Sequence, residues 1–561
     1  MDISDAPEPR RFSFPAAAHS TAFALLFANL ILSPWAYGSW EAWWFWPMLA
    51  LIFAAGLFSG VGALAETVSI DSRGWSLAGR FRNSKSLAAL GLCAAPFLIY
   101  AAARATFPSA PDRPMVEMET DRCLMLVFSP VVIAFVSFFS LTRRRLRFIC
   151  RALVVNILVI AAYASISQYL TYGLDKQDYV MWTPTEWDYG DRAKGPFFCP
   201  NHLSAFLNLG LCLLLAYAFT PAGALRKRAA AGALALALFA ANFFTLSRGG
   251  LASAIAGLAL GFMFFAMRGR KLWLRIAAPA LAIAAAAAVG AAIVRTDNPV
   301  MERVKSHPLY KVATAEHSEP GEFSKRLRDT FWHSFDRGQY IGAALRVWRS
   351  NPVWGVGPGQ HSNRWTEFAA TDYAADGGPV VHPENGDYSQ MRRPRMANDN
   401  YHLYEVHSDW TQLLEEFGAV GFALFLPPIL LVFILLYNSQ TLALRKASEP
   451  PAEQKTSDAD ADGDGDSDAE EAEAYAVRRG RSRSRHRRHS RRGATSAAST
   501  PWRSDEAPAP FELSLPLAGL FACLVLAVHS LGDFSLQIPS ITWAFAFMLA
   551  AGILAAARTH R

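Results

Sequence analysis

Long apolar blocks separated by short charged loops limit the fold of this chain more than any other feature. Each block holds about 18–25 residues, and a helix needs about 20 apolar residues to cross a bilayer. We therefore predict an all-α polytopic membrane protein with about twelve transmembrane helices. The predicted spans are 20–38, 43–65, 86–104, 123–142, 148–170, 201–220, 229–246, 249–267, 272–295, 415–437, 513–531 and 540–557.

Short basic loops indicate how these spans are oriented. The sequences RRRLR at 143–147, RKR at 226–228 and RGRK at 268–271 all fall on one side if the spans alternate. Because short cytoplasmic loops carry an excess of Lys and Arg, that side is predicted to be the cytoplasm. Both termini are then cytoplasmic, and the segment 296–412 lies outside. The first span has no convincing cleavage site, so we expect it to be retained.

The spans and two long segments between them divide the chain into five regions. We predict transmembrane helices 1–9 in 1–295, a partly helical external subdomain in 296–412, helix 10 in 413–437, a disordered charged cytoplasmic insert in 438–511, and helices 11–12 in 512–561. The external segment has enough aromatic residues to fold, and GQYIGAALRVWRS at 338–350 is a candidate amphipathic helix. Its HPENGDYSQMRRPRMANDN portion is expected to be mobile.

The 438–511 insert is predicted to be a solvated tether, because its acidic run and its Arg-rich run leave little apolar surface to bury. DADGDGDSDAEE matches the spacing of a calcium loop, but no amphipathic helices flank it, so we predict no metal site. Anionic lipid rather than nucleic acid is the expected partner of the Arg-rich run. Cys123 and Cys199 could both reach the outer face, but we interpret the six cysteines as buried small apolar residues.

The sequence VHSDWTQLLEEFGAVG, residues 406–421, places polar side chains directly before an apolar span. If residues 407–422 form one helix, then His407, Gly418 and Gly421 share a face. The two glycines would let another helix approach closely. An interfacial histidine with two packing glycines explains the same spacing, so this motif alone does not establish a catalytic site.

Other polar residues are predicted to reach the same outer face. Arg248 lies in a short turn between two spans, where a cation is costly unless it faces the bundle interior or a polar cavity. Arg346 lies on the external helix candidate. Arg192 and Asn201 lie at the outer start of a span, where Asn201 could equally be a helix N-cap. Asp533 follows the eleventh span and could orient a histidine, hold an arginine or cap the next segment.

The predicted convergence of these arginines, His407 and Asp533 on one side favours a site for an anionic ligand. Guanidinium groups bind phosphate oxygens in a bidentate manner, so several arginines around His407 suit a phosphate leaving group. A neutral histidine beside them can accept a proton from a hydroxyl.

The chain resembles the O-antigen ligases in the motif at 406–421 and in several other sequence blocks that occur in the same order. That family's pattern is His, then Asn, Ser or Gln, nine residues, Gly, two residues and Gly, and it is matched by His407, Ser408, Gly418 and Gly421. KGPFFCPNHLS, TLSRGG, LRVWRSNPVWGVGPG and HSLGDFSLQIPS resemble further blocks of the superfamily, which includes the O-antigen polymerases. The resemblance covers roughly residues 190–437 and 513–557, and the charged insert departs from it.

The resemblance implies a membrane-embedded, type C-like glycosyltransferase that is inverting and uses neither a metal nor a cofactor. Its donor would be an undecaprenyl-pyrophosphate-linked glycan, and its acceptor a glycolipid or glycan at the periplasmic face of the bacterial inner membrane. His407 would be the general base on the acceptor hydroxyl, while Arg248 and Arg346 would hold the pyrophosphate. Topology adds Arg192, Asn201 and Asp533 as candidate substrate-binding residues.

Several functions stay open at this point. The same site chemistry fits ligation to a lipid A core, polymerisation of repeat units, or transfer to a protein hydroxyl. A transporter or flippase would also suit twelve spans, but transporters place charges near the bilayer midplane rather than on one face. A membrane scaffold that works through its cytoplasmic insert is a third possibility.

Overall fold

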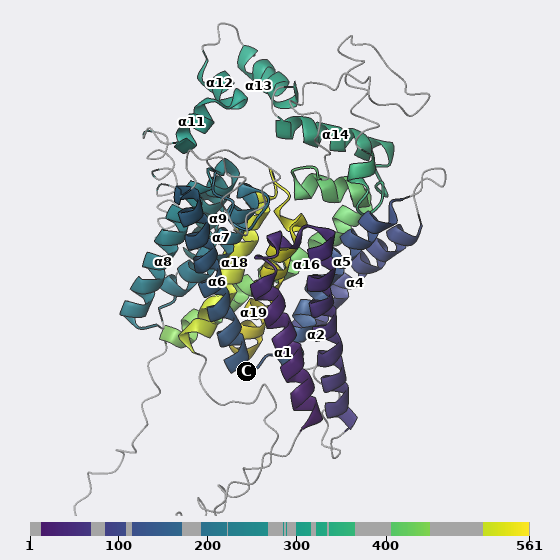
Figure 1. Ribbon diagram of the computed structural model, residues 1–561, viewed down its shortest axis with the longest axis vertical. Helices are drawn as coiled ribbons and strands as arrows, with labels where there is room; N and C mark the ends of the chain where they lie inside the picture. Colours follow the sequence, from purple (N-terminus) through teal and green to yellow (C-terminus); the bar gives the residue numbers. More distant parts are fainter. Residues whose placement is uncertain are drawn as a thin grey trace, which may run out of the picture.

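The computed structural model describes residues 13–68, 85–107, 115–170, 192–221, 223–266, 299–315, 321–333, 336–364, 405–448 and 509–559. Every regular element in these ranges is a helix (Figure 1). Ten of the helices are long and apolar enough to cross a membrane. The prediction of an all-α polytopic membrane protein is therefore confirmed.

The ten long helices correspond to ten of the predicted spans. They are α1 (Phe14–Leu32), α2 (Ala42–Val68), α4 (Lys85–Thr106), α5 (Glu117–Ser140), α6 (Arg143–Leu170), α7 (Pro200–Phe219), α8 (Leu225–Phe244), α16 (Asp409–Ser448), α18 (Pro510–His529) and α19 (Pro539–Thr559). A shorter apolar helix, α9 (Arg248–Ala266), occupies the predicted span 249–267. The predicted span 272–295 lies almost entirely outside the described residues. Helix α16 extends through residues 438–448, which we predicted to belong to the disordered insert, and the insert residues 449–508 are not among those described.

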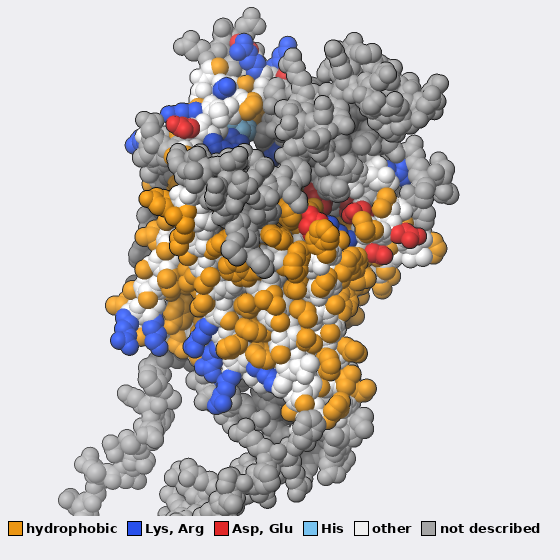
Figure 2. Space-filling model, viewed as in Figure 1, with side chains coloured by type: hydrophobic (Ala, Val, Ile, Leu, Met, Phe, Trp, Pro, Cys, Tyr) orange, Lys and Arg blue, Asp and Glu red, His pale blue; other side chains and the backbone are white. Residues whose placement is uncertain are grey.

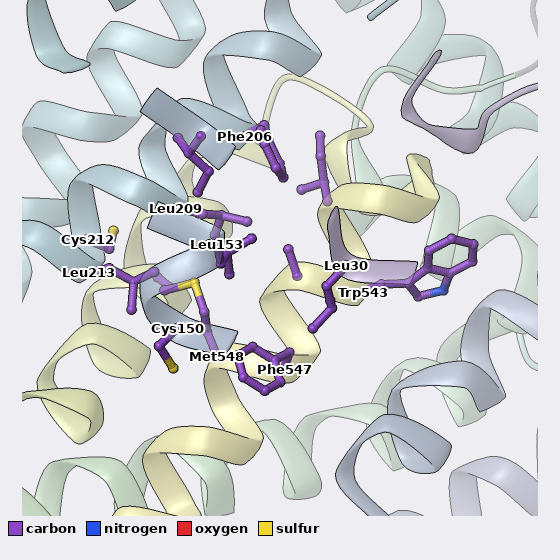
Figure 3. Close-up of a cluster of buried hydrophobic side chains, with 14 of the residues drawn as sticks. Leu30, Cys150, Leu153, Phe206, Leu209, Cys212, Leu213, Trp543, Phe547 and Met548 are labelled. Atoms are coloured by element: carbon purple, nitrogen blue, oxygen red, sulfur yellow. The ribbon is translucent and has the colours of Figure 1, made fainter. Parts of the chain in front are cut away.

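The centre of the bundle is formed by α7, α18 and α19. Phe206, Phe521, Trp543 and Phe547 have no more than 1% of their surface exposed, and several of them meet in the cluster of Figure 3. The indole N–H of Trp543 donates to Ser129 Oγ at 2.9 Å, which satisfies the polar atom of this buried ring. These helices are apolar on all sides, as a helix surrounded by other helices must be.

Four short helices form a layer over one end of the bundle (Figure 1): α11 (Pro299–Lys305), α12 (Pro308–Thr314), α13 (Glu322–His333) and α14 (Asp336–Ser350). The helix predicted at 338–350 lies within α14. Figure 2 shows an orange apolar band below this layer and a group of basic side chains at the opposite end of the band. The exposed Arg144, Arg226 and Lys227 begin α6 and α8 at that basic end.

Helix α16 is interrupted at Gly418, whose φ of 67° and ψ of −175° are not helical. The predicted single helix over 407–422 is therefore wrong: the helix begins at Asp409, and its geometry breaks nine residues later. A loop after α14 occupies the break. The amides of Val356 and Gly357 donate to the carbonyls of Glu415 and Glu416, at 3.0 and 2.9 Å. This backbone pairing satisfies groups that the broken helix cannot satisfy.

Candidate active site

The residues around His407 are joined to the turn between α18 and α19. The Asp409 amide donates to the Asp533 carbonyl at 3.2 Å, and Ser408 Oγ donates to the Ser530 carbonyl at 3.2 Å. In return, Asp409 Oδ2 accepts hydrogen bonds from Ser530 Oγ at 2.6 Å and from the Leu536 amide at 3.1 Å. Two segments more than 120 residues apart in sequence are thus held in a fixed position relative to each other. Ser408 also accepts from the Thr411 hydroxyl at 3.1 Å, so it stabilises the first turn of α16.

His407 is held in a strained backbone conformation between two aromatic rings. Its φ is 59°, a value that costs a non-glycine residue on the order of 1–3 kcal/mol and persists only where the surroundings impose it. The imidazole stacks on Tyr340 with a centroid separation of 5.1 Å. It meets Phe534 edge to face, with a centroid separation of 4.7 Å. Its Nδ1 is buried and makes no hydrogen bond within the described residues. This nitrogen is therefore available to a ligand.

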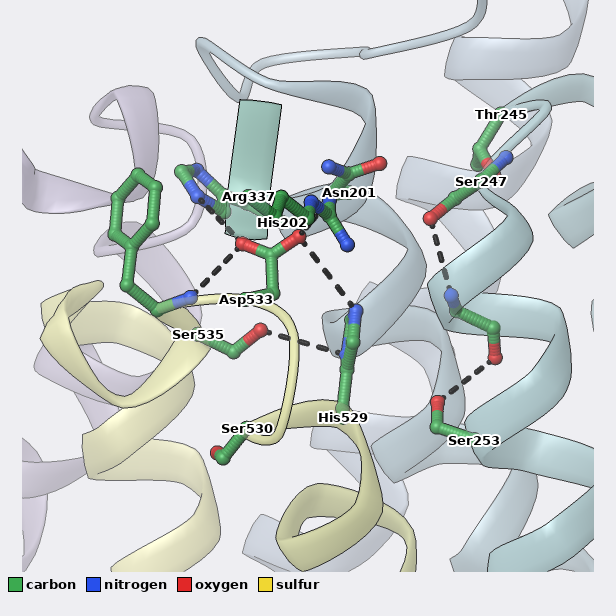
Figure 4. A network of polar contacts seen from close by, with 12 residues as sticks. Asn201, His202, Thr245, Ser247, Ser253, Arg337, His529, Ser530, Asp533 and Ser535 are labelled. Atoms are coloured by element: carbon green, nitrogen blue, oxygen red, sulfur yellow. Dashed lines mark hydrogen bonds and ion pairs between the residues drawn. The ribbon is translucent and has the colours of Figure 1, made fainter. Parts of the chain in front are cut away.

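Asp533 is the charged centre of the site and is fully buried (Figure 4). Its Oδ2 accepts from Arg337 Nη2 at 3.0 Å, and its Oδ1 accepts from the Phe534 amide at 2.9 Å. His202 Nε2 lies 3.9 Å from Oδ1, and His529 Nε2 lies 4.0 Å from Oδ2. Burial alone would raise the pKa of Asp533, but Arg337 and the surrounding histidines outweigh it, so the pKa lies below its ordinary value. Asp533 is an anion at neutral pH.

The pKa of His407 is lowered to about 3. Burial is the main cause, Asp533 opposes it, and the nearby Arg337 and His202 add to it. An imidazole with this pKa is neutral at physiological pH and has a free nitrogen, which is the state a general base requires. The anionic Asp533 beside it favours the imidazolium that forms once the base has taken a proton.

A cationic group lies next to Asp533. Arg248 begins α9, and its Nη1 donates to the carbonyl of Arg303 on α11 at 2.7 Å. The pKa of His307 is lowered to about 4 by burial and then by Arg248 and Arg337. Burial and Arg337 also lower the pKa of Arg303. Cations this close raise one another's energy, so an anion placed among them would be strongly favoured.

The turn that carries Arg248 is fixed by its own polar residues. Thr245 Oγ1 accepts from the Ser247 amide at 3.1 Å, and Ser247 Oγ accepts from the Gly250 amide at 3.1 Å. A Cβ at Gly250 would lie 1.7 Å from Ser204 Oγ, so only glycine allows α9 to lie this close to α7.

Arg346 and Arg337 lie on different sides of the same helix. Arg346 lies on α14 with Arg337 and Tyr340, but nine residues of helix place Arg337 and Arg346 roughly 180° apart around its axis. Arg337, which sequence reasoning missed, makes the Asp533 contact instead.

Arg192 and Asn201 bind each other. Arg192 Nη2 donates to Asn201 Oδ1 at 2.8 Å, and its Nε donates to the Thr245 carbonyl at 2.9 Å. The pair thereby joins the start of α7 to the end of α8. The N-cap of α7 is Cys199, so the alternative interpretation of Asn201 as a helix cap is wrong.

The two motif glycines have different partners. A Cβ at Gly418 would lie 2.4 Å from the Gly355 amide nitrogen and 2.4 Å from the Val353 carbonyl oxygen, so this glycine admits the loop backbone rather than a second helix. A Cβ at Gly421 would lie 2.8 Å from the ring of Tyr100 on α4. Gly421 therefore does lie against another helix, as the sequence predicted for both.

Several residues of the site were not found from the sequence. They are Arg337, Tyr340, His529 and Phe534, together with Arg303 and the neighbouring His307. His529 and Phe534 lie within HSLGDFSLQIPS, so this block could have drawn attention to them. The others come from the outer helix layer and are recognisable only once that layer is folded over the bundle.

Side chains of metal-binding types also occur here. His202, His529 and Asp533 surround one point, but in the described ranges no group of three or more His, Cys, Asp or Glu residues is arranged to hold a metal ion. All six cysteines are free thiols.

Comparison with known proteins gives one family match and no curated relative. No curated protein matches the chain. Residues 232–426 match the family model described as O-antigen ligase, a region that includes Arg248, Arg337, Arg346 and His407. This match covers less than half of the chain, and together with the ten candidate spans it supports the resemblance to the O-antigen ligase and polymerase superfamily.

Proposed function

We propose that this protein transfers a glycan from undecaprenyl pyrophosphate to an acceptor hydroxyl, with the lipid A core as acceptor, as in O-antigen ligation. The observation that carries the proposal is His407: a neutral imidazole with an unpartnered buried Nδ1, next to the Asp533 anion and a cationic group. The family match supports an enzyme of the ligase and polymerase type.

In the proposed reaction, the acceptor oxygen attacks the anomeric carbon of the donor sugar while its proton passes to His407. The bond between the anomeric carbon and the pyrophosphate oxygen breaks, and undecaprenyl pyrophosphate leaves with both electrons of that bond. Attack from the side opposite the leaving group inverts the anomeric configuration. Asp533 stabilises the imidazolium that results, and this transfer requires no metal ion.

The cationic group is suited to the leaving group. Arg248 and Arg337 would neutralise the charge that develops on the pyrophosphate, and such preorganised charge is often the largest contribution to catalysis. Arg346 remains a candidate for the same role through a movement of α14 or through more distant parts of the donor. Arg192 and Asn201 are proposed to support the site by holding α7 against α8.

Orientation follows the same proposal. The site lies at the end of the bundle under the α11–α14 layer, and the basic residues gather at the other end (Figure 2). By the positive-inside tendency, the basic end and both termini are cytoplasmic. The site would then face the periplasm from the bacterial inner membrane, where the lipid-linked donor is displayed.

The alternative functions are either glycosyltransferases with a different acceptor or a different class of membrane protein, a transporter. A polymerase, or an oligosaccharyltransferase acting on a protein hydroxyl, would use the same base and leaving group. A transporter would be expected to hold an ion pair near the bilayer midplane. The buried ion pairs described here lie near helix ends instead: Arg337–Asp533 at the outer end and Arg143–Glu512 at the basic end.

The deciding experiment is the composition of lipid-linked glycans in native cells that carry His407→Ala. Long polymers that accumulate on the lipid carrier and are lost from the surface would support a ligase. Single repeat units would indicate a polymerase. An unchanged lipid-linked pool and surface glycan would reject glycosyl transfer by His407. Arg226→Ala, on the exposed basic end, is the matched control for expression and membrane insertion.

A further inference from the structure

Backbone strain draws attention to a segment near the amino terminus. Among the described residues, four non-glycine residues have positive φ: Tyr37 at 52°, Ser39 at 59°, Leu246 at 47° and His407 at 59°. His407 is the proposed base, and Leu246 begins the turn that presents Arg248. Strained conformations of this kind tend to cluster at functional sites. Tyr37 and Ser39 belong to the turn between α1 and α2, and this turn delivers the chain to Trp40.

Trp40 lies one aromatic ring away from His407. Its ring centroid is 5.9 Å from that of Phe534, and Phe534 in turn is 4.7 Å from the His407 ring. The guanidinium of Arg122, near the start of α5, packs over the Trp40 ring, with Cζ 4.2 Å from the ring centroid. A half-buried aromatic strip therefore runs from the base to an arginine that the proposed mechanism does not use.

One buried donor on this strip has no partner among the described residues. Arg122 Nη2 is buried and makes no hydrogen bond within the described residues, although buried polar atoms in folded proteins are nearly always paired. This donor would be satisfied by a ligand that carries acceptor oxygens.

The electrostatic surroundings differ on the two sides of His407. Arg337 contacts Asp533 on one side of His407, whereas Glu405 precedes His407 by two residues. Gln412 Nε2 donates both to Glu405 Oε2 and to Glu416 Oε1, so these two carboxyl groups lie close together. Burial, and then the neighbouring Glu416, raise the pKa of Glu405 well above its ordinary value, with Arg122 opposing them. Figure 2 shows acidic side chains at the outer margin of the apolar band, near the ends of α4 and α5. Carboxyl groups of this kind can exchange hydrogen bonds with the neutral hydroxyls of a sugar.

We propose that Trp40, Arg122 and Glu405 form a pyranose-binding subsite that holds the acceptor sugar with one hydroxyl at His407. This assignment rests on the proposed function. The apolar C–H face of a sugar ring packs well on an aromatic ring, and its hydroxyls both donate to carboxyl oxygens and accept from guanidinium N–H groups. Division of the site in this way keeps the donor pyrophosphate among the arginines and the acceptor among the carboxyl groups.

Donor and acceptor glycans both contain pyranose rings, so the test must separate them. Full-length protein in vesicles of phosphatidylethanolamine and phosphatidylglycerol is given two probes: an undecaprenyl-pyrophosphate-linked glycan, and the outer-membrane glycolipid from native cells that lack the protein. Initial rates are measured with each probe varied in turn. Trp40→Ala is expected to raise the KM of the acceptor about tenfold or more, while the KM of the donor changes less than about twofold.

Further variants separate a subsite from a folding defect. Trp40→Phe keeps a ring for packing and should recover most of the acceptor KM. Arg122→Gln should raise the acceptor KM in the same direction as Trp40→Ala. Trp43→Ala is the matched control, since this tryptophan lies in the same segment but is 76% exposed, and it should change neither KM.

The outcomes that overturn the subsite are distinct from failure of the proposed function. A Trp40→Ala protein that inserts normally and keeps the wild-type acceptor KM would overturn the subsite, as would a rise confined to the donor KM. In both cases the wild-type protein still transfers glycan. If the wild-type protein makes no product from these probes, the proposed ligase activity is wrong, and the acceptor subsite is withdrawn with it.

Discussion

Arg337 Nη2 lies 3.0 Å from Asp533 Oδ2, and this buried ion pair joins the outer helix layer to the turn between α18 and α19. The same Asp533 provides the backbone carbonyl that accepts from the Asp409 amide, two residues after His407. One residue therefore holds the proposed base, a guanidinium and the turn in fixed relation. Removal of its charge should weaken the contact with Arg337 and the stabilisation of the His407 imidazolium, whereas the backbone hydrogen bond to Asp409 would remain.

The first prediction concerns that charge. Asp533→Asn keeps the size of the side chain but removes the anion that compensates Arg337 and stabilises the imidazolium. We expect kcat to fall about 100-fold or more, equivalent to about 2.7 kcal/mol of transition-state stabilisation. The measurement is glycan transfer in vesicles at saturating donor and acceptor. Asp121→Asn, on an exposed position of α5, serves as control, and wild-type kcat in Asp533→Asn would refute the role.

The second prediction concerns Arg248. Arg248→Lys keeps the positive charge but loses the fork of donors that binds phosphate oxygens and reaches the Arg303 carbonyl. Transfer should fall at least about tenfold, which corresponds to about 1.4 kcal/mol. The readout is kcat/KM for the lipid-linked donor, compared with Arg226→Lys at the basic end. Full activity of Arg248→Lys would make this arginine an ordinary interfacial residue.

The third prediction concerns the break in α16. Gly418→Ala puts a methyl group 2.4 Å from backbone atoms of the loop after α14, at a φ of 67° that disfavours any side chain. Strain of this kind costs about 1–3 kcal/mol, and the overlap adds to it. We expect a clearly lower midpoint of thermal unfolding in detergent. Gly232→Ala in α8 meets nothing within 4 Å and should not lower it.

If Gly418→Ala unfolds at the wild-type midpoint, the loop is not packed in the break as described. The direct check on this loop is hydrogen exchange of the Gly357 amide. This amide donates to the Glu416 carbonyl at 2.9 Å and should be protected only while the loop fills the break.

The membrane spans could be predicted from the sequence because burial in lipid or in a bundle requires about 20 consecutive apolar residues, and this signal is local. Counting those spans also predicted that Asp533 and His407 lie at the same end of the bundle, and the structure brings the two together. Arg337 could not be found in this way. It lies just before the predicted amphipathic helix, and nothing in the local pattern distinguishes it from Arg346 or Arg349.

The motif glycines show why spacing alone was insufficient. Glycines at 418 and 421 are expected both for close helix packing and for a helix break, because each needs a residue without Cβ. Only the contact with the loop at Gly355 separates the two explanations, and that contact spans more than 60 residues. Likewise, Trp40 and Phe534 meet only through the fold, so no local pattern links the α1–α2 turn to the site.

The fourth prediction concerns the charged insert. Replacement of residues 449–508 by a flexible Gly/Ser linker of equal length should change transfer by less than about twofold, since such a linker keeps the reach between α16 and α18. The assay is surface glycan in native cells with matched protein levels. Loss of the surface glycan, with His407 intact, would favour the scaffold hypothesis, in which the insert is the working part.

The fifth prediction is the pH dependence of activity. With a folded-state pKa of about 3, His407 is neutral from pH 8 to well below pH 6.5. The acid limb of kcat/KM, which reports the free enzyme, should therefore lie below the pKa of an ordinary histidine, about 6.5. A plateau down to about pH 5 is expected. An acid limb at pH 6.5 or above would show that the imidazole is solvated rather than enclosed by Tyr340 and Phe534.

The same shift predicts how stability depends on pH. An unfolded chain protonates this histidine near pH 6.5, whereas the folded chain resists protonation until about pH 3. Between these values the unfolded state binds more protons, so the stability contributed by His407 is complete above about pH 6.5 and is lost as the pH falls. Wild-type protein should therefore lose more thermal stability than His407→Gln on going from pH 7.5 to about 4.5. Asp533 faces His407 with a lowered pKa and titrates below this window, so it does not contribute to the difference. Equal losses in the two proteins would mean that His407 is not desolvated in the folded state, and its assignment as a neutral enclosed base would fail.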